Sequence, residues 1–214
     1  MVLWRKEAAA MTREERKAVR TLKKDLPKIV KPLIKPYGFR ITSGRVWVRK
    51  DDMLYVMIPL INIKEAAILH TTFLAKPVFA DDYLWDILGM EENKSEPFSL
   101  RVTGAFTAQP VNFHVSNHPL SVLDARELEA GLREDLEYLS AHIASVSPDG
   151  LSWFREMEAR QERYWQSDVM RLILLLHDGN RDEAAAHLEQ HSMRDFIING
   201  KSFGELVEEY RRRV

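Results

Sequence analysis

The hydrophobic period of the sequence changes twice, and these changes constrain the fold more strongly than any other feature. Between residues 13 and 35, apolar residues recur every three or four positions, which is typical of a helix with one buried face. From Phe39 the period is two, as in a β-strand, and near Asp124 the helical period returns. The sequence therefore predicts an α+β fold. A small, mostly antiparallel sheet of about five strands would be packed by an N-terminal helix and a long helix and followed by a C-terminal helical extension.

The N-terminal helix has a start signal and a stop signal. Thr12-Arg13-Glu14-Glu15 has the form of a capping box, in which the threonine and glutamate side chains satisfy backbone N–H groups at the start of a helix. Pro27 and Pro32 each remove a backbone hydrogen bond, so we expect a kinked or two-part helix. Pro36 and Gly38 should end it.

Alternation and turn signals predict the elements between these helices. The segment 98–107 shows the clearest alternation and is expected to be a strand with one solvated face. Residues 91–96 should form a charged loop and residues 117–119 a turn. Further strands are expected at 45–49, 53–63, 67–75 and 111–116, with helices at 81–88 and 124–146.

The loss of alternation after Ser147-Pro148-Asp149-Gly150 predicts a domain boundary there. Residues 1–146 would form an α+β domain, with residues 1–11 flexible, and residues 147–214 a helical extension or small helical subdomain. A second capping-box pattern, Ser202-Phe203-Gly204-Glu205, should open the last helix.

Composition excludes several classes of protein. The longest aliphatic run, Leu172–Leu176, is far shorter than the roughly 20 residues that span a bilayer. No apolar stretch of signal-peptide length follows the first charges. The chain has no cysteine, which excludes disulfides and thiolate chemistry. These features favour a cytoplasmic protein that does not enter a membrane.

Charge is distributed unevenly along the chain. The first 50 residues contain 15 Lys/Arg and 4 Asp/Glu, whereas the remaining 164 contain 16 and 28. The basic helix could pair with acidic residues of the long helix, or it could bind an anionic partner. Nucleic acid is disfavoured, because no aromatic residues are interleaved with the basic ones. The acidic residues in question are Glu127, Glu134 and Glu137, and a nucleic-acid interface would use Arg16, Arg20, Lys23 and Lys24.

Motifs for catalysis and nucleotide binding are absent from the sequence. It contains no Gly-x-Ser-x-Gly, no Gly-x-Gly-x-x-Gly and no Gly-x4-Gly-Lys-Ser/Thr. Adjacent carboxylates such as Asp81-Asp82 are interpreted as solvated. We therefore assign no catalytic residue and no cofactor, and our leading hypothesis is a non-enzymatic binding or protein-interaction module. Its partner is unknown; another protein, or a second copy of the chain bound through the C-terminal helices, fits this hypothesis.

Four polar residues could form a ligand site if the sheet brings them together. Arg101 and His114 are expected on the polar face of neighbouring strands, where His70 and His118 could join them. Such a group could hold a phosphate or carboxylate. The enzymatic alternative is a hydrolase or transferase that acts on a small anion at this face. A solvated sheet face would carry the same residues without any site.

No metal site is predicted. His114 and His118 have a ligand spacing that is meaningful only on a helix, and they are expected in a strand and a turn. His187 and His191 share a helix face with Glu183, but surface helices often produce this pattern.

One stretch of the chain is similar to a known family. The segment Lys31-Pro32-Leu33-Ile34-Lys35-Pro36-Tyr37-Gly38-Phe39, followed by Gly44, Trp47 and Arg49, resembles the opening of a bacterial domain of unknown function catalogued as family 4304. Members typically have a basic helix that ends in Gly-Phe, a short hairpin and further antiparallel strands. The resemblance implies this fold for about residues 12–146 and leaves residues 147–214 without a counterpart. It implies no activity, because the family is uncharacterised.

Overall fold

The computed structural model describes residues 12–63, 67–121, 123–147, 149–160 and 165–213. The predicted flexibility of residues 1–11 concerns residues outside this description. The chain divides into two compact units, each of which combines segments that are far apart in the sequence. Of the described residues, unit 1 comprises those up to Val48 and those within Val56–Phe73 and His114–Ser145. Unit 2 comprises Arg49–Tyr55, Leu74–Phe113 and the described residues from Val146 onward.

The main sheet has five strands, which are neighbours in the order in which they occur along the chain. Neighbouring strands are antiparallel, and the two-residue turn Asp51-Asp52 joins the second to the third. The predicted α+β class and antiparallel sheet are confirmed. The strands are β1 (Arg40–Thr42), β2 (Arg45–Lys50), β3 (Met53–Ile63), β4 (Ala67–Pro77) and β5 (Val111–Pro119).

Helix α1 (Arg13–Ile34) begins at the predicted capping box. The Glu15 N–H donates to Thr12 Oγ1 at 3.2 Å, and the Thr12 N–H donates to Glu15 Oε2 at 2.6 Å. The helix continues through Pro27 and Pro32 as one element, so of the two expected forms the two-part helix is wrong and the kinked helix stays a prediction. Buried residues of its apolar stripe lie on both sides of the prolines, and their burial offsets the lost backbone hydrogen bonds.

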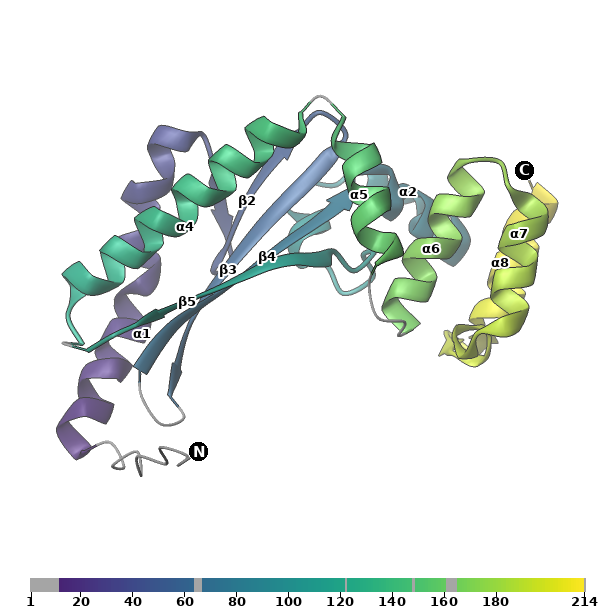
Figure 1. Ribbon diagram of the computed structural model, residues 1–214. Coiled ribbons are helices and arrows are strands. Elements are labelled where there is room, and N and C mark those ends of the chain that lie inside the picture. The colour runs from purple at the N-terminus through teal and green to yellow at the C-terminus, as the bar shows by residue number, and fades with distance from the viewer. Residues whose placement is uncertain (1–11, 64–66, 122, 148, 161–164, 214) are drawn as a thin grey trace, which may run out of the picture. The chain divides into compact units, whose positions relative to one another are not determined.

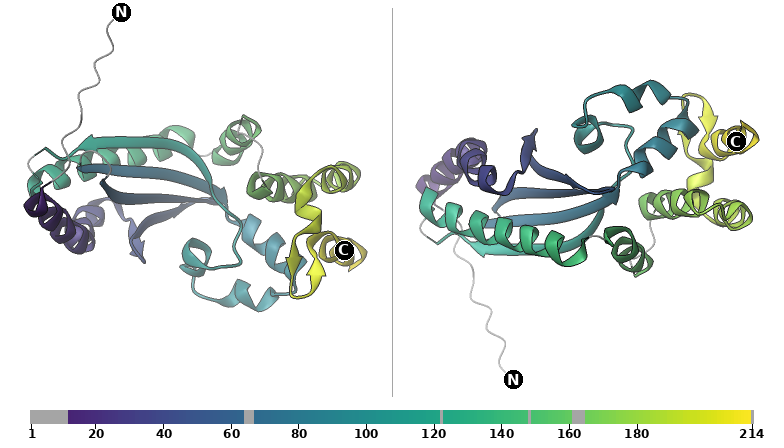
Figure 2. Two further views of the ribbon diagram at one scale, coloured as in Figure 1. Left: turned by 90° about the horizontal axis from the view of Figure 1, so that it is seen from below. Right: turned by 90° about the horizontal axis from the view of Figure 1, so that it is seen from above.

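In unit 1, α4 (Ala125–Val146) lies against one face of β4 and β5 (Figures 1 and 2). Asp124 caps the helix as predicted, because its Oδ1 accepts the Glu127 N–H at 2.8 Å. Gly131 permits a close approach: a Cβ there would lie 2.9 Å from His118 Cγ and 3.1 Å from Leu69 Cδ2. The fully buried stripe of α4 consists of Leu128, Leu132, Leu136 and Leu139.

Unit 2 contains most of the described helices, and its apolar helix α6 packs against α7 and α2. The predicted helical C-terminal part is confirmed. None of the described helices is both long and apolar enough to cross a membrane. The helical elements of this unit are α2 (Phe79–Leu88), η2 (Glu91–Ser95), α3 (Leu100–Thr103), α5 (Gly150–Ala159), α6 (Trp165–His177), α7 (Arg181–Gln190), η3 (Ser192–Asp195) and α8 (Phe203–Arg213).

The segment 98–107 is not the strand that its alternation predicted. It contains the short helix α3 and a loop that leads toward β5. The alternating apolar residues have separate environments: Val102 is buried, Phe106 is 45% exposed, and the Phe98 ring lies under the guanidinium groups of Arg49 and Arg101. Their alternation therefore does not correspond to one face of a sheet.

Three smaller expectations also need correction. Residues 117–119 belong to β5 instead of forming a turn, and residues 91–95 form a 3-10 helix instead of a loop. Residues 197–202 form a hairpin, β6 (Ile197–Ile198) and β7 (Lys201–Ser202), within a region expected to be helical. One boundary between the compact units falls between Ser145 and Val146, beside the expected domain boundary, and residues 74–113 group with the C-terminal helices. The expected domains 1–146 and 147–214 stay a prediction.

We predict that Gly131→Ala destabilises the protein, although alanine favours helices by about 1 kcal/mol over glycine. The added Cβ would collide with His118 and Leu69, and overpacking of this kind costs about 1 to 3 kcal/mol. Urea denaturation measures the change. Ala130→Gly, at the exposed neighbouring position, is the control and should lose only about 1 kcal/mol from helix propensity. A Gly131→Ala variant as stable as the wild type would contradict the close approach of α4 to the sheet.

Candidate functional site

The three histidines of the predicted ligand group do not share one face of the sheet. His70, on β4, donates from Nδ1 to Asn117 Oδ1 at 2.9 Å. His118, on β5, donates from Nε2 to Asp135 Oδ1 of α4 at 2.8 Å. Because successive side chains of a strand point to opposite faces, Asn117 and His118 face opposite ways, and so do His70 and His118.

His114 faces α4 together with His118. Its ring lies 4.2 Å from that of Tyr138 and 5.3 Å from that of Phe73, measured between centroids. This histidine is therefore half-buried between the sheet and α4, in an aromatic cluster whose Tyr138 is 38% exposed.

Ser116, His118 and Asp135 lie close together beside α4, but their hydrogen-bond arrangement does not suit nucleophilic catalysis. Both Ser116 Oγ, at 2.6 Å, and His118 Nε2 donate to the same carboxylate oxygen, Asp135 Oδ1. A nucleophilic serine would instead donate to an imidazole that is oriented by the carboxylate. Asp135 is 2% exposed, so this carboxylate connects α4 to β5 inside the unit.

Arg101 belongs to α3 of unit 2 and is held by partners in that unit. Its guanidinium donates to Asp82 Oδ1 at 2.7 Å and to the Val78 carbonyl at 3.0 Å, and it lies 4.7 Å from the centroid of the Trp85 ring. The side chain is 10% exposed. These contacts give Arg101 a structural role, and the sheet does not bring it onto a common strand face with His114 as predicted.

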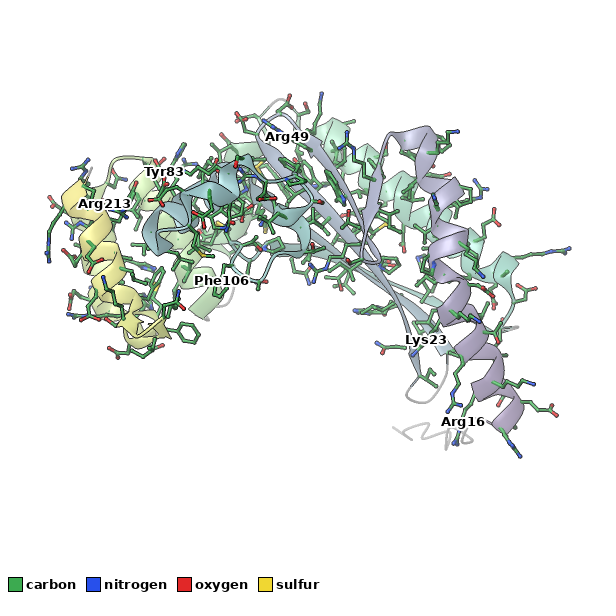
Figure 3. All side chains as sticks on the ribbon, turned by 180° about the vertical axis from the view of Figure 1, so that it is seen from behind. Arg16, Lys23, Arg49, Tyr83, Phe106 and Arg213 are labelled. Atoms are coloured by element: carbon green, nitrogen blue, oxygen red, sulfur yellow. The ribbon has the colours of Figure 1, made fainter. Side chains whose placement is uncertain are left out.

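The four residues proposed for nucleic-acid binding are exposed on α1. Arg16 and Lys23, which are seven residues apart, lie along one side of the helix (Figure 3). Among the described residues, Arg20, Lys23 and Lys24 form no ion pair with a carboxylate, so they do not make the expected pairing with the long helix.

Unit 2 contains an apolar pocket of about 230 Å³. Leu84 and Leu88 of α2 form one side, and residues 105–109 form another. Val169, Met193 and Phe203 contribute from the C-terminal helical region. The described residues that line the pocket are mostly apolar and include no titratable side chain, so the pocket can bind apolar groups.

Buried charged groups fix one wall of this pocket. Lys76 Nζ donates to Asp81 Oδ1 at 2.7 Å and to the Ala108 carbonyl at 2.8 Å. Asp81 Oδ1 also accepts the Ala108 N–H at 2.8 Å. Nearby, Trp85 Nε1 donates to the Phe106 carbonyl at 2.6 Å. The backbone of the loop is thereby held at two positions although it has no regular secondary structure.

The Lys76–Asp81 pair is almost completely removed from solvent. The two side chains are 1% and 0% exposed. Burial raises the pKa of the Asp81 carboxyl, and this effect is opposed by the Lys76 ammonium, the Ala108 N–H and the Arg101 guanidinium. The interpretation of Asp81-Asp82 as solvated is therefore wrong for Asp81.

Exposed apolar residues surround the pocket and extend the apolar surface. Phe106, labelled in Figure 3, is 45% exposed and Phe196 is 51% exposed, and both line the pocket. Ile197, the neighbour of Phe196, is 63% exposed. Sequence reasoning missed this site because its residues come from separate segments and carry no common motif.

Comparisons with protein-family models, with curated proteins and with solved structures found no match for this chain. The resemblance to family 4304 therefore stays a prediction.

We predict that Asp81→Asn destabilises the protein by about 3 to 5 kcal/mol, because the buried Lys76 ammonium would lose its counter-charge. The asparagine keeps an oxygen for the Ala108 N–H, so the loss would report the charge and not the backbone hydrogen bond. Chemical denaturation measures it. Glu129→Gln, which removes the exposed pair with Arg133, should change stability by less than about 0.5 kcal/mol. Equal losses of stability for the two substitutions would show that the buried pair contributes no more to stability than the exposed pair.

Proposed function

We propose that this protein is a non-enzymatic protein-interaction module that holds an apolar side chain of a partner protein in the pocket of unit 2. The observation that carries this proposal is the apolar lining of the pocket, together with the exposed Phe106 and Phe196 beside it. Aromatic residues next to a pocket are typical of positions that dominate binding energy at protein interfaces.

The pocket and its surroundings favour a protein partner over a small molecule. Its volume of about 230 Å³ suits one aromatic or branched aliphatic side chain. The exposed Phe196 and Ile197 continue the apolar surface, and a partner protein would cover more of it than a small ligand could. The wall held by the Lys76–Asp81 pair would need little ordering on binding, which lowers the entropic cost of association.

The enzymatic alternative has less support. It required His70, His114 and Arg101 to converge on one anion, but His70 and His114 face opposite sides of the sheet and Arg101 is held by Asp82. A cytoplasmic location belongs to the proposal as well, since the chain has no cysteine that would indicate an oxidising compartment.

A second candidate function is the binding of nucleic acid along α1. The observation that favours it is that Arg20, Lys23 and Lys24 are exposed and, within the described part of the chain, form no ion pair with a carboxylate. Helix α1 carries eight Lys/Arg and three Asp/Glu, so its exposed side is a basic surface.

To test the pocket, short random peptides displayed on phage would be selected against the wild-type protein. We expect the selected peptides to share an apolar anchor residue. They should bind Ala105→Trp at least tenfold more weakly, because an indole at this exposed lining position would obstruct the pocket. Calorimetry measures both affinities.

The control adds the same indole elsewhere. Leu60→Trp changes an apolar position of β3 that is 52% exposed and belongs to unit 1, and it should leave peptide affinity unchanged. If no peptide is enriched, or if both tryptophan variants bind equally well, the pocket is not the interaction site. Binding of apolar small molecules without any peptide binding would favour a ligand-binding protein instead.

To test the second candidate, fluorescence anisotropy with labelled single-stranded DNA would compare the wild type with the triple variant Arg20→Gln, Lys23→Gln, Lys24→Gln. If α1 binds the phosphate backbone of the DNA, the slope of log K against log salt concentration should become about 2 less steep. Each lost phosphate contact lowers the steepness of this slope by about 0.7. The matched control replaces three other exposed basic residues, Lys50, Arg126 and Arg160, with glutamine. The absence of binding by the wild type at low salt would end this proposal.

A further inference from the structure

Two helices of unit 2 bring three potential metal ligands together. Helices α6 and α7 are joined by a short turn and pack against each other. Asp168 lies in the first turn of α6, His187 in the last turn of α7, and His191 directly after α7. One nitrogen of each imidazole and one oxygen of the carboxylate lie within 4.8 Å of one another.

The carboxylate of Asp168 is buried and only partly satisfied. The residue is 5% exposed. Its Oδ2 lies 3.3 Å from His191 Nδ1, whereas its Oδ1 has no hydrogen-bond partner among the described residues. A buried carboxylate oxygen without a partner is costly, and a bound cation would remove that cost.

A backbone contact prepares His187 for coordination. Its Nε2 lies 3.0 Å from the carbonyl oxygen of Asp168. A carbonyl oxygen can only accept, so Nε2 carries the proton and, in the neutral ring, Nδ1 is the nitrogen without a proton. Metal-binding histidines typically donate their second ring N–H to a carbonyl or carboxylate in this way.

Direct ion pairing explains the cluster less well. The two imidazole rings are 4.3 Å apart between centroids, so protonation of both would place two positive charges side by side. With one ring protonated, Asp168 Oδ1 would still have no partner. A divalent cation satisfies the carboxylate and both neutral imidazoles together.

We propose that Asp168, His187 and His191 form a binding site for a divalent transition-metal ion of the Zn²⁺ class. Two imidazoles and one carboxylate are ligands that suit zinc and its neighbours, whereas Mg²⁺ and Ca²⁺ prefer oxygen ligands alone. Three protein ligands leave a tetrahedral ion one position for water or another ligand. His191 also borders a surface hollow of about 610 Å³, from which such a ligand can approach.

The ion would connect the free ends of the α6–α7 pair, opposite the turn that joins the two helices. Val169 follows Asp168, and Met193 is two residues from His191; both line the apolar pocket. The ion would therefore stabilise the part of unit 2 that contributes Val169 and Met193 to the pocket. The metal site does not depend on the proposed peptide binding, and either proposal can fail while the other stands.

Calorimetric titration of the full chain with Zn²⁺, after treatment with EDTA, tests the site. We expect one ion per chain and at least tenfold weaker binding for His187→Gln, His191→Gln and Asp168→Asn. Affinity should also fall more than tenfold from pH 7.5 to pH 5.5, because both imidazoles must be neutral to coordinate. With Co²⁺, the wild type should show a visible absorption band that His191→Gln abolishes.

Glu183→Gln is the matched control, because Glu183 is an exposed carboxylate on the same helix, four residues before His187. It should leave Zn²⁺ affinity unchanged. Circular dichroism in EDTA verifies that each variant folds. If Asp168→Asn does not fold, the Zn²⁺ affinity of His191→Gln decides the outcome, because His191 is only half-buried. The proposal is overturned if the wild type binds no Zn²⁺, if His191→Gln binds it as tightly, or if Glu183→Gln weakens it equally.

Discussion

The buried ion pair between Lys76 and Asp81 is the interaction on which the pocket of unit 2 depends. Removing two charges from water costs several kcal/mol per ion, and an apolar pair of similar volume would avoid that cost. Such a pair, however, would leave both the N–H and the carbonyl of Ala108 without partners inside the protein. The charges therefore serve to specify the conformation of a loop. This loop contributes Phe106 and Ala108 to the pocket, so the polar interior of unit 2 determines the shape of its apolar site.

Local signals in the sequence were sufficient for most of the fold. The capping boxes at Thr12 and Ser202, the cap at Asp124 and the leucine stripe of α4 all depend on residues within a few positions of each other, and all are present. The predicted strand at 98–107 was wrong because the alternating apolar residues lie in three unrelated tertiary environments. The β6–β7 hairpin was missed although Asn199-Gly200 is a characteristic two-residue turn, with φ values of 51° and 82°.

The candidate site was less accessible to sequence reasoning than the fold. Which strand residues share a face depends on register, and β5 extends through His118 where a turn was expected. The position of Arg101 could not be predicted once its segment was assigned to a strand. Asp81 looked like a surface carboxylate because its partners are 5 residues before it and 27 residues after it. Burial of charge depends on such distant partners, and hydrophobic periodicity carries no information about them.

Three buried aspartates show how the same side chain acquires different roles. Asp81, Asp135 and Asp168 each have one carboxylate oxygen without a hydrogen-bond partner in the described part of the chain. For Asp81 the charge is compensated by Lys76, and Arg101 Nη1 lies 3.7 Å from Oδ2, the oxygen without a hydrogen bond. Asp135 receives a hydroxyl and an imidazole on its other oxygen and connects a helix to a strand. Asp168 has two imidazoles beside it, and its Oδ2 lies 3.3 Å from His191 Nδ1. Of the three, Asp168 is the one whose carboxylate lies with two imidazoles in a group that can hold a cation, so an added cation would gain most there.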